Sequence, residues 1–185
     1  MANFWSTPDV EPKRNFRFQV QITGLGTNDV LWWAKTVTTP SFQVSEVEHN
    51  FLDNKYYYPG RASWNEVSMT LVDPISIDAV EQTNKLLVDS GYIIPSGAPS
   101  SNAQKATISK KKAAAALKQV TITVLKADGS EVEKWTLQNP FIKSAKYGDL
   151  DYSNDELRTV EMSLRYDWAT CETNTEGSNT QFETT

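Results

Sequence analysis

Hydrophobic and polar residues alternate along much of this chain, which is typical of strands that bury one face. Residues 16–22 alternate strictly, and a glycine-containing turn separates them from a second apolar run at 30–37, so we expect these two runs to form a hairpin. Further strands are expected at 41–48 and 64–72. The side chains expected to point inward are Phe16, Phe18, Val20, Ile22, Phe42, Val44, Val47, Val67, Met69 and Leu71.

The second half of the chain repeats this pattern. Strands are expected at 118–126 and 131–138, on either side of Asp128-Gly129, a two-residue hairpin signal that requires positive φ. A weaker strand is expected at 141–147 and a long one at 157–168. The inward side chains of the long strand are expected to be Val160, Met162, Leu164, Tyr166 and Trp168. Residues 170–185 are polar and threonine-rich, which predicts a disordered tail.

One helix has clear boundary signals. Asp73 is a suitable N-cap, Pro74 fits the first helical position, and Gly91 ends the segment after about Ser90. Its apolar stripe is expected to contain Ile77, Val80 and Leu87. The fold class predicted from these elements is mainly β: an antiparallel β-sandwich or half-barrel with one flanking α-helix.

Three segments interrupt the alternating pattern within a domain at 1–169. The N-terminal residues 1–14 are expected to form an irregular arm. Residues 49–62 predict a long loop that is rich in aromatic residues and suited to contact with another subunit; the alternative is a loop that folds onto its own domain. Residues 95–117 predict a flexible basic segment, in which alanines after Lys110-Lys111-Lys112 favour a short exposed helix.

Composition excludes several classes of protein. The chain has 185 residues, one cysteine, one histidine, a formal net charge of −5 and a pI of about 5.0. An acidic chain with one short lysine run does not favour nucleic-acid binding through phosphate contacts. One cysteine excludes an intramolecular disulfide. We also expect neither a signal peptide nor a membrane span, because the N-terminus lacks a charged region and no run of about 18 apolar residues exists.

Catalytic chemistry has little support. The single histidine, His49, would have to serve any Ser-His-Asp or Cys-His mechanism, and no serine elbow accompanies it. The acids between Asp149 and Glu156 lack the spacing of a calcium loop. Gly24-Leu25-Gly26 lacks the third glycine of a phosphate-binding loop. We therefore predict no enzyme activity, no catalytic residue, no metal site and no cofactor.

Ordered motifs along the chain resemble a known family. They are Asn15–Val20, Ala34–Thr36 followed by Pro40, then Asn54, Gly60 and Trp64, then Leu137–Pro140, Gly148–Glu156 and Tyr166–Trp168. Together they resemble the tail tube proteins of contractile-tailed, T-even-like bacteriophages, over about residues 15–168. The tail after Ala169 and the lysine-alanine segment have no clear match.

The resemblance implies hexameric rings in which strands of every subunit close one large β-barrel. Rings would stack into a tube inside the contractile sheath of the virion tail, after assembly in the host cytoplasm. The implied partners are other copies of the chain, the tail sheath protein, the tape measure protein and the baseplate tube initiator. Double-stranded DNA would pass through the tube during ejection without specific binding.

Residue roles follow from that picture as expectations. A water-filled lumen requires polar side chains on one strand face. The candidate lumen-facing residues are Thr121, Thr123, Glu131, Glu133, Thr159, Glu161, Ser163 and Arg165. The candidate ring-to-ring contact residues are Phe51, Leu52, Tyr56, Tyr57, Tyr58 and Arg61. The candidate sheath contact residues are Lys110, Lys111 and Lys112.

Three alternatives remain open at the level of sequence. The chain could be an initiator or terminator of the tube with the same fold. It could belong to a contractile toxin-injection particle rather than a phage. It could be a carbohydrate-binding sandwich in which Trp32, Trp33 and the tyrosines stack on sugars.

Overall fold

The computed structural model describes residues 11–25, 33–76, 78–95, 105–175 and 178–181. Several expectations fall outside these ranges: most of the N-terminal arm, the first part of the strand at 30–37 with Trp32, Ile77, residues 96–104 and the end of the tail.

The first of two packed sheets has five strands. They are β1 (Phe18–Ile22), β6 (Val120–Leu125), β7 (Glu131–Gln138), β10 (Trp168–Thr175) and β11 (Ser178–Gln181). Their order is β1-β6-β7-β10-β11, and every pairing is antiparallel. The expected β6–β7 hairpin is confirmed, and Gly129 has the required positive φ of 83°. We call this layer the five-strand sheet.

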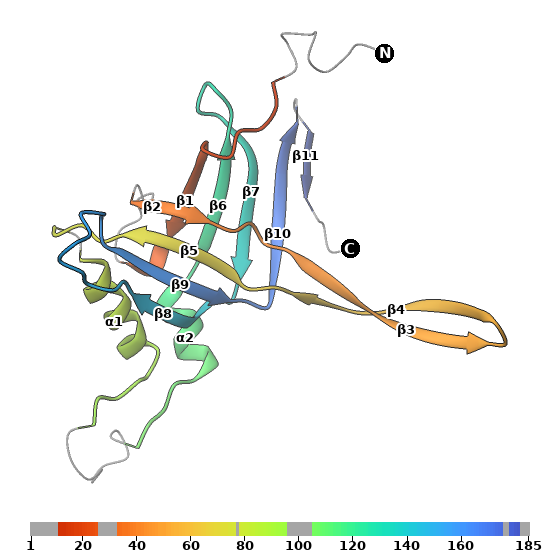
Figure 1. Cartoon of the computed structure of the whole chain (residues 1–185), viewed down its shortest axis with the longest axis horizontal. Helices are drawn as coiled ribbons and strands as arrows, with labels where there is room; N and C mark the ends of the chain where they lie inside the picture. Colours follow the sequence, from red (N-terminus) through yellow and green to blue (C-terminus); the bar gives the residue numbers. More distant parts are fainter. Residues whose placement is uncertain (1–10, 26–32, 77, 96–104, 176–177, 182–185) are drawn as a thin grey trace.

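The second layer is the four-strand sheet. It contains β2 (Ala34–Val37), β5 (Val67–Val72), β9 (Thr159–Arg165) and β8 (Phe141–Tyr147), in the order β2-β5-β9-β8. All of its pairings are antiparallel. Its strands cross those of the five-strand sheet steeply (Figure 1). The predicted antiparallel sandwich is confirmed.

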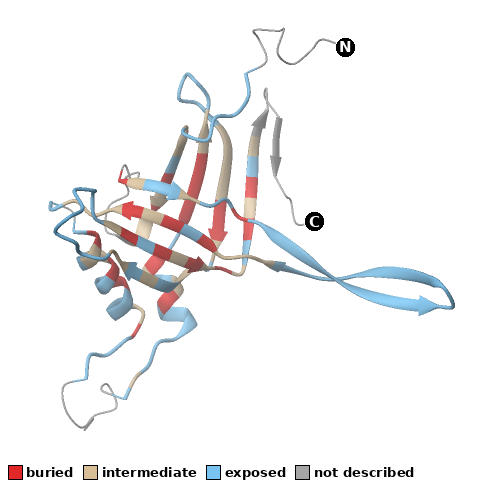
Figure 2. Cartoon of the chain, in the orientation of Figure 1, coloured by how far each residue is buried: buried red, intermediate tan, exposed pale blue. Residues whose placement is uncertain are grey.

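The core lies between these sheets and follows the alternation of the sequence. On β5 and β9, buried side chains occupy every second position, and Figure 2 shows buried residues along both sheets where they face each other. Those exposed by 2% or less include Val20, Ile22, Val67, Met69, Leu71, Val120, Ile122, Leu137, Val160, Met162 and Leu164. Cys171 on β10 is also buried, and burial raises the pKa of its thiol.

The expected hairpin between 16–22 and 30–37 is wrong. β1 pairs with β6, and β2 pairs with β5 in the other sheet. Sequence neighbours are therefore separated by a change of sheet, which local alternation cannot reveal. Phe16 precedes β1 and its side chain is 75% exposed, in contrast to its expected burial.

Helix α1 (Ala79–Asp89) begins later than its sequence signals indicate. Asp78 is the N-cap, and its carboxylate accepts a hydrogen bond from the backbone N–H of Glu81. Asp73 instead accepts a hydrogen bond from the N–H of Ala79 at 2.9 Å, before the helix begins. The buried residues of the helix are Ala79, Thr83 and Leu86, whereas Leu87 is exposed.

The short helix favoured after Lys110 is present, so the described part of the chain has two α-helices rather than the one flanking helix expected, and this second helix is not fully exposed. Helix α2 (Lys110–Leu117) is capped by Ser109, and its Ala113 and Leu117 side chains are buried. It packs beside β8 and the short 3₁₀ turn η1 (Thr23–Leu25). The approach is close, because a Cβ on Gly24 would lie 2.1 Å from the carbonyl oxygen of Ala116. The end of the predicted flexible segment is therefore fixed to the sandwich.

The expected loop at 49–62 is a β-hairpin. Strands β3 (Phe42–Phe51) and β4 (Asn54–Trp64) pair along their length and project from the sandwich (Figure 1). Leu52 adopts a positive φ of 52° in the turn. Pro59 and Gly60 lie where the register shifts, so these strand-breaking residues mark a bulge rather than a loop. Contrary to expectation, Phe42, Val44 and Val47 are exposed.

The long strand expected at 157–168 is divided between the sheets. β9 ends at Arg165, and β10 begins at Trp168 in the five-strand sheet. The intervening Asp167 donates its backbone N–H to Gln138 and accepts hydrogen bonds from Lys110 and Asn139 through its carboxylate. Trp168 is 48% exposed instead of buried. The disordered tail expected at 170–185 is wrong for residues 170–175 and 178–181, which form the rest of β10 and β11.

Candidate assembly surfaces

The outer face of the five-strand sheet carries two rows of mostly neutral polar residues, beside the exposed Trp168 at the start of β10. The strand registers place Gln21, Thr121, Thr136 and Thr170 in one row across β1, β6, β7 and β10, with Gln19, Thr123, Lys134 and Glu172 in the next. Thr121 and Thr123 are each only 6% exposed. We call this surface the threonine-glutamine face.

The register separates the candidate lumen residues of β6 and β7. Glu133 pairs with Val124 and therefore lies on the core side, opposite to the face of Thr121 and Thr123. Its carboxylate accepts hydrogen bonds from Lys13 and from the Trp135 indole. Burial raises the pKa of Glu133, but these two donors outweigh it and hold the pKa below its usual value. Glu131 lies at the end of β7, beside the turn.

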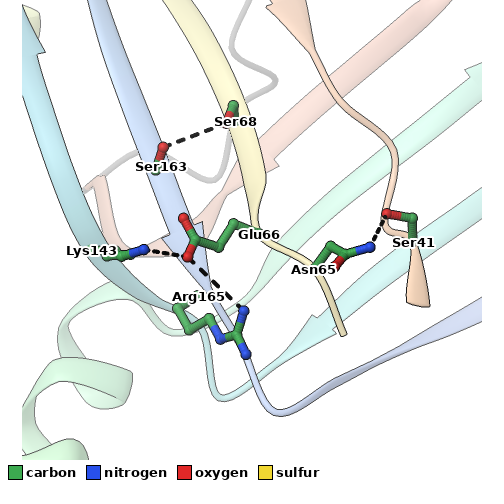
Figure 3. Close-up of polar contacts among 7 residues, drawn as sticks. All are labelled: Ser41, Asn65, Glu66, Ser68, Lys143, Ser163 and Arg165. Carbon is green, nitrogen blue, oxygen red and sulfur yellow. Dashed lines mark hydrogen bonds and ion pairs between the residues drawn. The ribbon is translucent and has the colours of Figure 1, made fainter. Parts of the chain in front are cut away.

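The second candidate set lies on the outer face of the four-strand sheet. Thr159, Glu161, Ser163 and Arg165 alternate along β9 with its buried residues. Figure 3 shows that Glu66 lies between Lys143 and Arg165, and that the hydroxyls of Ser68 and Ser163 are 3.4 Å apart. Asn65 donates to the Ser41 hydroxyl at 3.0 Å beside this cluster. This face is charged, unlike the threonine-glutamine face.

The two sheets also differ at their edges. Helices α1 and α2 lie beside β8, which is one edge of the four-strand sheet (Figure 1). β1 is an edge strand of the five-strand sheet, and β11 covers the opposite edge only beside Glu172–Thr175. Within the described part of the chain, Trp168–Cys171 of β10 pair on one side only. The five-strand sheet therefore presents pairing positions at both ends.

The hairpin has two different faces beyond its bulge. The pairs Val47–Tyr58 and His49–Tyr56 share one face with Phe51, and we call this the aromatic face. Glu46, Glu48 and Asn50 alternate onto the other, which also carries Lys55 and Tyr57. Lys55 pairs with Glu48 at 3.0 Å, and this contact is the main reason that the pKa of Glu48 lies below its usual value. We call this second surface the acidic face.

The base of the hairpin is fixed to the sandwich through aromatic rings. Phe42 meets Trp64 edge-on with ring centroids 5.6 Å apart, and Trp64 meets Tyr166 at 6.0 Å. The direction in which the hairpin leaves the domain is therefore set by packing. Phe51, Leu52, Tyr56, Tyr57, Tyr58 and Arg61 are all exposed, and they are divided between the two faces and the turn.

The three candidate sheath lysines do not form one free patch. The Lys110 ammonium group donates to both carboxylate oxygens of Asp167 at 2.7 Å, which lowers the pKa of that carboxyl. Lys112 has its backbone N–H in the Ser109 cap. Lys111 is exposed and makes no ion pair with the described residues.

Neither a metal cluster nor a membrane helix occurs in the described part of the chain. No group of three or more His, Cys, Asp or Glu residues is placed to hold a metal ion there. No described helix has the length and apolar character needed to cross a bilayer.

Comparison with known proteins gives matches to solved structures alone. No family model and no curated sequence matches the chain. A chain in the six-fold symmetrised anti-feeding prophage baseplate has a TM-score of 0.62 at 11% identity, over 87% of this chain and 95% of its own. A chain in the PVC sheath/tube terminator, from an extracellular contractile injection system, has a TM-score of 0.60 at 15% identity, over 88% and 97%.

A third match is a chain of the anti-feeding prophage tube terminating cap. Its TM-score is 0.57 at 14% identity, over 94% of this chain and 100% of its own. The fold is that of contractile-particle tube-type proteins. The tube-type fold confirms the mainly antiparallel architecture that the resemblance implied. Baseplate and cap components share this fold with tube components, so the fold alone does not distinguish these roles.

The sequence interpretation missed most of the threonine-glutamine face of this tube-type fold. Gln19 and Gln21 were expected on the polar face of a strand and Thr170 in the disordered tail, and none of them was linked to Thr121. Their common signal is an outward row of Thr and Gln with few charges. It becomes visible only when strand order is known, because the strands are far apart in the sequence.

Proposed function

We propose that this chain is a structural subunit whose copies form rings, and that the rings stack into the inner tube of a contractile phage tail. The fold shared with tube, baseplate and cap proteins of contractile particles supports this class of role. The finer assignment includes six copies per ring, passage of double-stranded DNA, and a place in the virion tail after assembly in the host cytoplasm.

The observation that carries the proposal is the pattern of edges. The four strands β1, β6, β7 and β10 alternate in direction. When copies are related by rotation about one axis, β10 of one copy and β1 of the next therefore meet antiparallel. Repeating this contact closes a barrel without an unpaired edge. Helices beside β8 prevent the four-strand sheet from extending in the same way.

The threonine-glutamine face is then the lining of the tube. Among its side chains, the only charged ones are Lys134 and Glu172, which face each other across β7 and β10. Neutral polar groups keep the lumen hydrated and offer few cations to DNA phosphates. The charged outer face of β9 points away from this lumen, so Thr159, Glu161, Ser163 and Arg165 become candidates for the outside of the tube.

Contacts between rings and with other proteins complete the proposal. We assign the aromatic face of the hairpin to the next ring, because exposed aromatic groups of this density are typical of protein interfaces. Lys111 and its neighbours on α2 remain the candidate sheath contact. The tape measure protein would occupy the lumen during assembly, and the baseplate tube initiator would template the first ring.

The first test is electron microscopy of the purified chain. Stacked rings or long hollow tubes are expected in negative stain. Rings that never extend would indicate an initiator or terminator instead. A monodisperse monomer at all concentrations would contradict the proposal, and glycan binding by that monomer would favour the carbohydrate-binding alternative.

A second test measures ring closure directly. Gln19→Cys and Thr170→Cys place thiols on the same face of β1 and β10, at the edges expected to meet. Oxidation of the double variant should give a covalent ladder that ends at the number of copies per ring, which we expect to be six. Each single variant is the control and should stop at dimers. A double variant that also stops at dimers would contradict edge-to-edge closure.

A further inference from the structure

A groove opens between the two sheets where their edge strands β1 and β2 lie. Its volume is about 1020 Å³, and residues from the segment before β1 form one wall. Phe18, Val37, Ile122 and Val124 give the floor an apolar character. Four cations line it: Lys13, Arg14, Arg17 and Lys35. We call it the basic groove.

Two of these four cations form ion pairs within the described part of the domain, and two do not. Arg17 pairs with Glu11 at 2.7 Å, and Lys13 pairs with Glu133. Arg14 and Lys35 form no ion pair with any described residue, although both line the groove. The Phe16 ring, 75% exposed, lies beside the Arg17 guanidinium with 5.4 Å between the group and the ring centroid. The groove thus offers cations and apolar surface to something outside the domain.

The hairpin of a second copy matches these properties. Its acidic face carries Glu46 and Glu48, with Tyr57 between them and Lys55. Glu46 forms no ion pair within the described part of the chain. Carboxylates with an adjacent aromatic ring complement a groove that combines cations and apolar floor.

The direction and length of the hairpin bring it to the groove of a neighbour. In Figure 1 the hairpin extends past β10, on the side of the domain opposite to β1. In a ring that joins β10 to the next β1, it therefore passes over the adjacent copy. Each copy would contribute four strands to the ring, and strands about 4.8 Å apart make one copy ~19 Å wide. The ten residues of β3 span ~33 Å, which is more than the width of one copy. The hairpin is long enough to cross the β1 edge of the neighbour.

We infer that the acidic face of each hairpin occupies the basic groove of the adjacent copy in the same ring. The inference rests on the proposed ring. It assigns the two faces of one hairpin to two partners: the acidic face to the neighbour in its ring, and the aromatic face to the next ring.

Disulfide trapping tests the contact. Copies with Lys35→Cys carry one affinity tag, and copies with Tyr57→Cys carry another, so that only cross-links between copies are counted. Tyr56→Cys is the matched control, because Tyr56 lies on the same strand with similar exposure but on the aromatic face. Because a disulfide needs Cβ atoms about 4 Å apart, we expect roughly five-fold more trapping with Tyr57→Cys.

Charge reversal gives a second measurement. Lys35→Glu should lower the yield of assembled rings, and adding Glu46→Lys in the same chain should restore it. Equal trapping by Tyr57→Cys and Tyr56→Cys in well-formed tubes would overturn the groove assignment but leave the tube proposal intact. A chain that never assembles would overturn both, since no second copy would then occupy the groove.

Discussion

The sandwich and the hairpin use similar residues in opposite ways. Between the sheets, aliphatic side chains such as Ile22 and Leu164 are exposed by 1% or less and pack in one hydrophobic core. In the hairpin, Val47 and Phe51 are 63% and 59% exposed, and every residue of β3 is exposed. A strand pair of this length with no core of its own is marginally stable in water. The proposed contacts with other copies would supply the stabilisation that the isolated hairpin lacks.

This contrast separates the residues that fold the subunit from those that assemble it. Core substitutions should lower the free energy of unfolding of the dispersed subunit. Substitutions in the hairpin should leave that free energy almost unchanged and act on tubes alone. Four predictions test the contrast, in order of their expected effect on unfolding.

Leu164→Ala should have the largest effect. Leu164 is fully buried near the end of β9, where it pairs with Val67 on one side and Ile142 on the other. The lost contacts and the cavity left behind should reduce the free energy of unfolding by about 2–5 kcal/mol. Urea denaturation of the dispersed subunit measures it. A change below about 1 kcal/mol would show that the sandwich core is less tightly packed than described.

Gly24→Ala should come next. The added Cβ would meet backbone atoms of Ala116 and Leu117 at 2.1 and 2.7 Å, and these atoms cannot rotate away. We expect a loss of about 1–3 kcal/mol as α2 shifts from the sandwich. Gly129→Ala is a useful comparison. Its Cβ would meet nothing within 4 Å, so only its positive φ opposes the change.

The ion pair of Asp167 should contribute a smaller, pH-dependent stabilisation. Hydrogen bonds from Lys110 and Asn139 lower the pKa of Asp167 in the folded state. A lowered pKa stabilises the fold above the unfolded value of about 3.9, and this stabilisation disappears as pH falls through the folded value. The stability difference between wild type and Asp167→Asn should therefore shrink below about pH 4. A constant difference from pH 7 to pH 2 would contradict this assignment.

Tyr56→Ser should have the smallest effect on unfolding and the largest on assembly. The side chain lies on the aromatic face, away from the sandwich, so the free energy of unfolding should change by less than about 0.5 kcal/mol. Tubes should nevertheless be lost or shortened in negative stain. Tyr57→Ser, on the acidic face, is expected to weaken rings rather than their stacking. Unfolding at a much lower urea concentration would place Tyr56 in the fold instead.

The sequence predicts the strands of the core better than their pairing. Alternation identifies β5, β6, β7 and β9 because one face of each contacts the core. It does not reveal that β1 and β2 lie in different sheets, since sheet assignment depends on contacts far apart in the sequence. The same limitation merges β9 with β10, because alternation continues almost unbroken through the change of sheet at Tyr166 and Asp167.

The assembly surfaces are predictable only in part. The aromatic residues at 51–58 indicate a contact surface. Pro59 and Gly60 make the same segment look like a loop, so the sequence does not predict the two strands that carry these residues. The alanines favour helix α2, but its attachment to the sandwich is not predicted, because lysines dominate the pattern and only two of its side chains, Ala113 and Leu117, are buried. No short stretch of sequence predicts the edges of the five-strand sheet, because a strand is an edge strand only when no other strand pairs with one of its sides.

The rate at which the buried thiol of Cys171 is modified would measure local opening of β10. Its thiol faces the core from β10, and burial raises its pKa, so little reactive thiolate exists while the sandwich is closed. A thiol reagent can modify it only during local opening of the strand next to the proposed joint between copies. The modification rate of free subunits, compared with that of assembled ones, would then report how strongly neighbours hold β10 in place. No substitution is needed for that measurement, because Cys171 is the single cysteine of the chain.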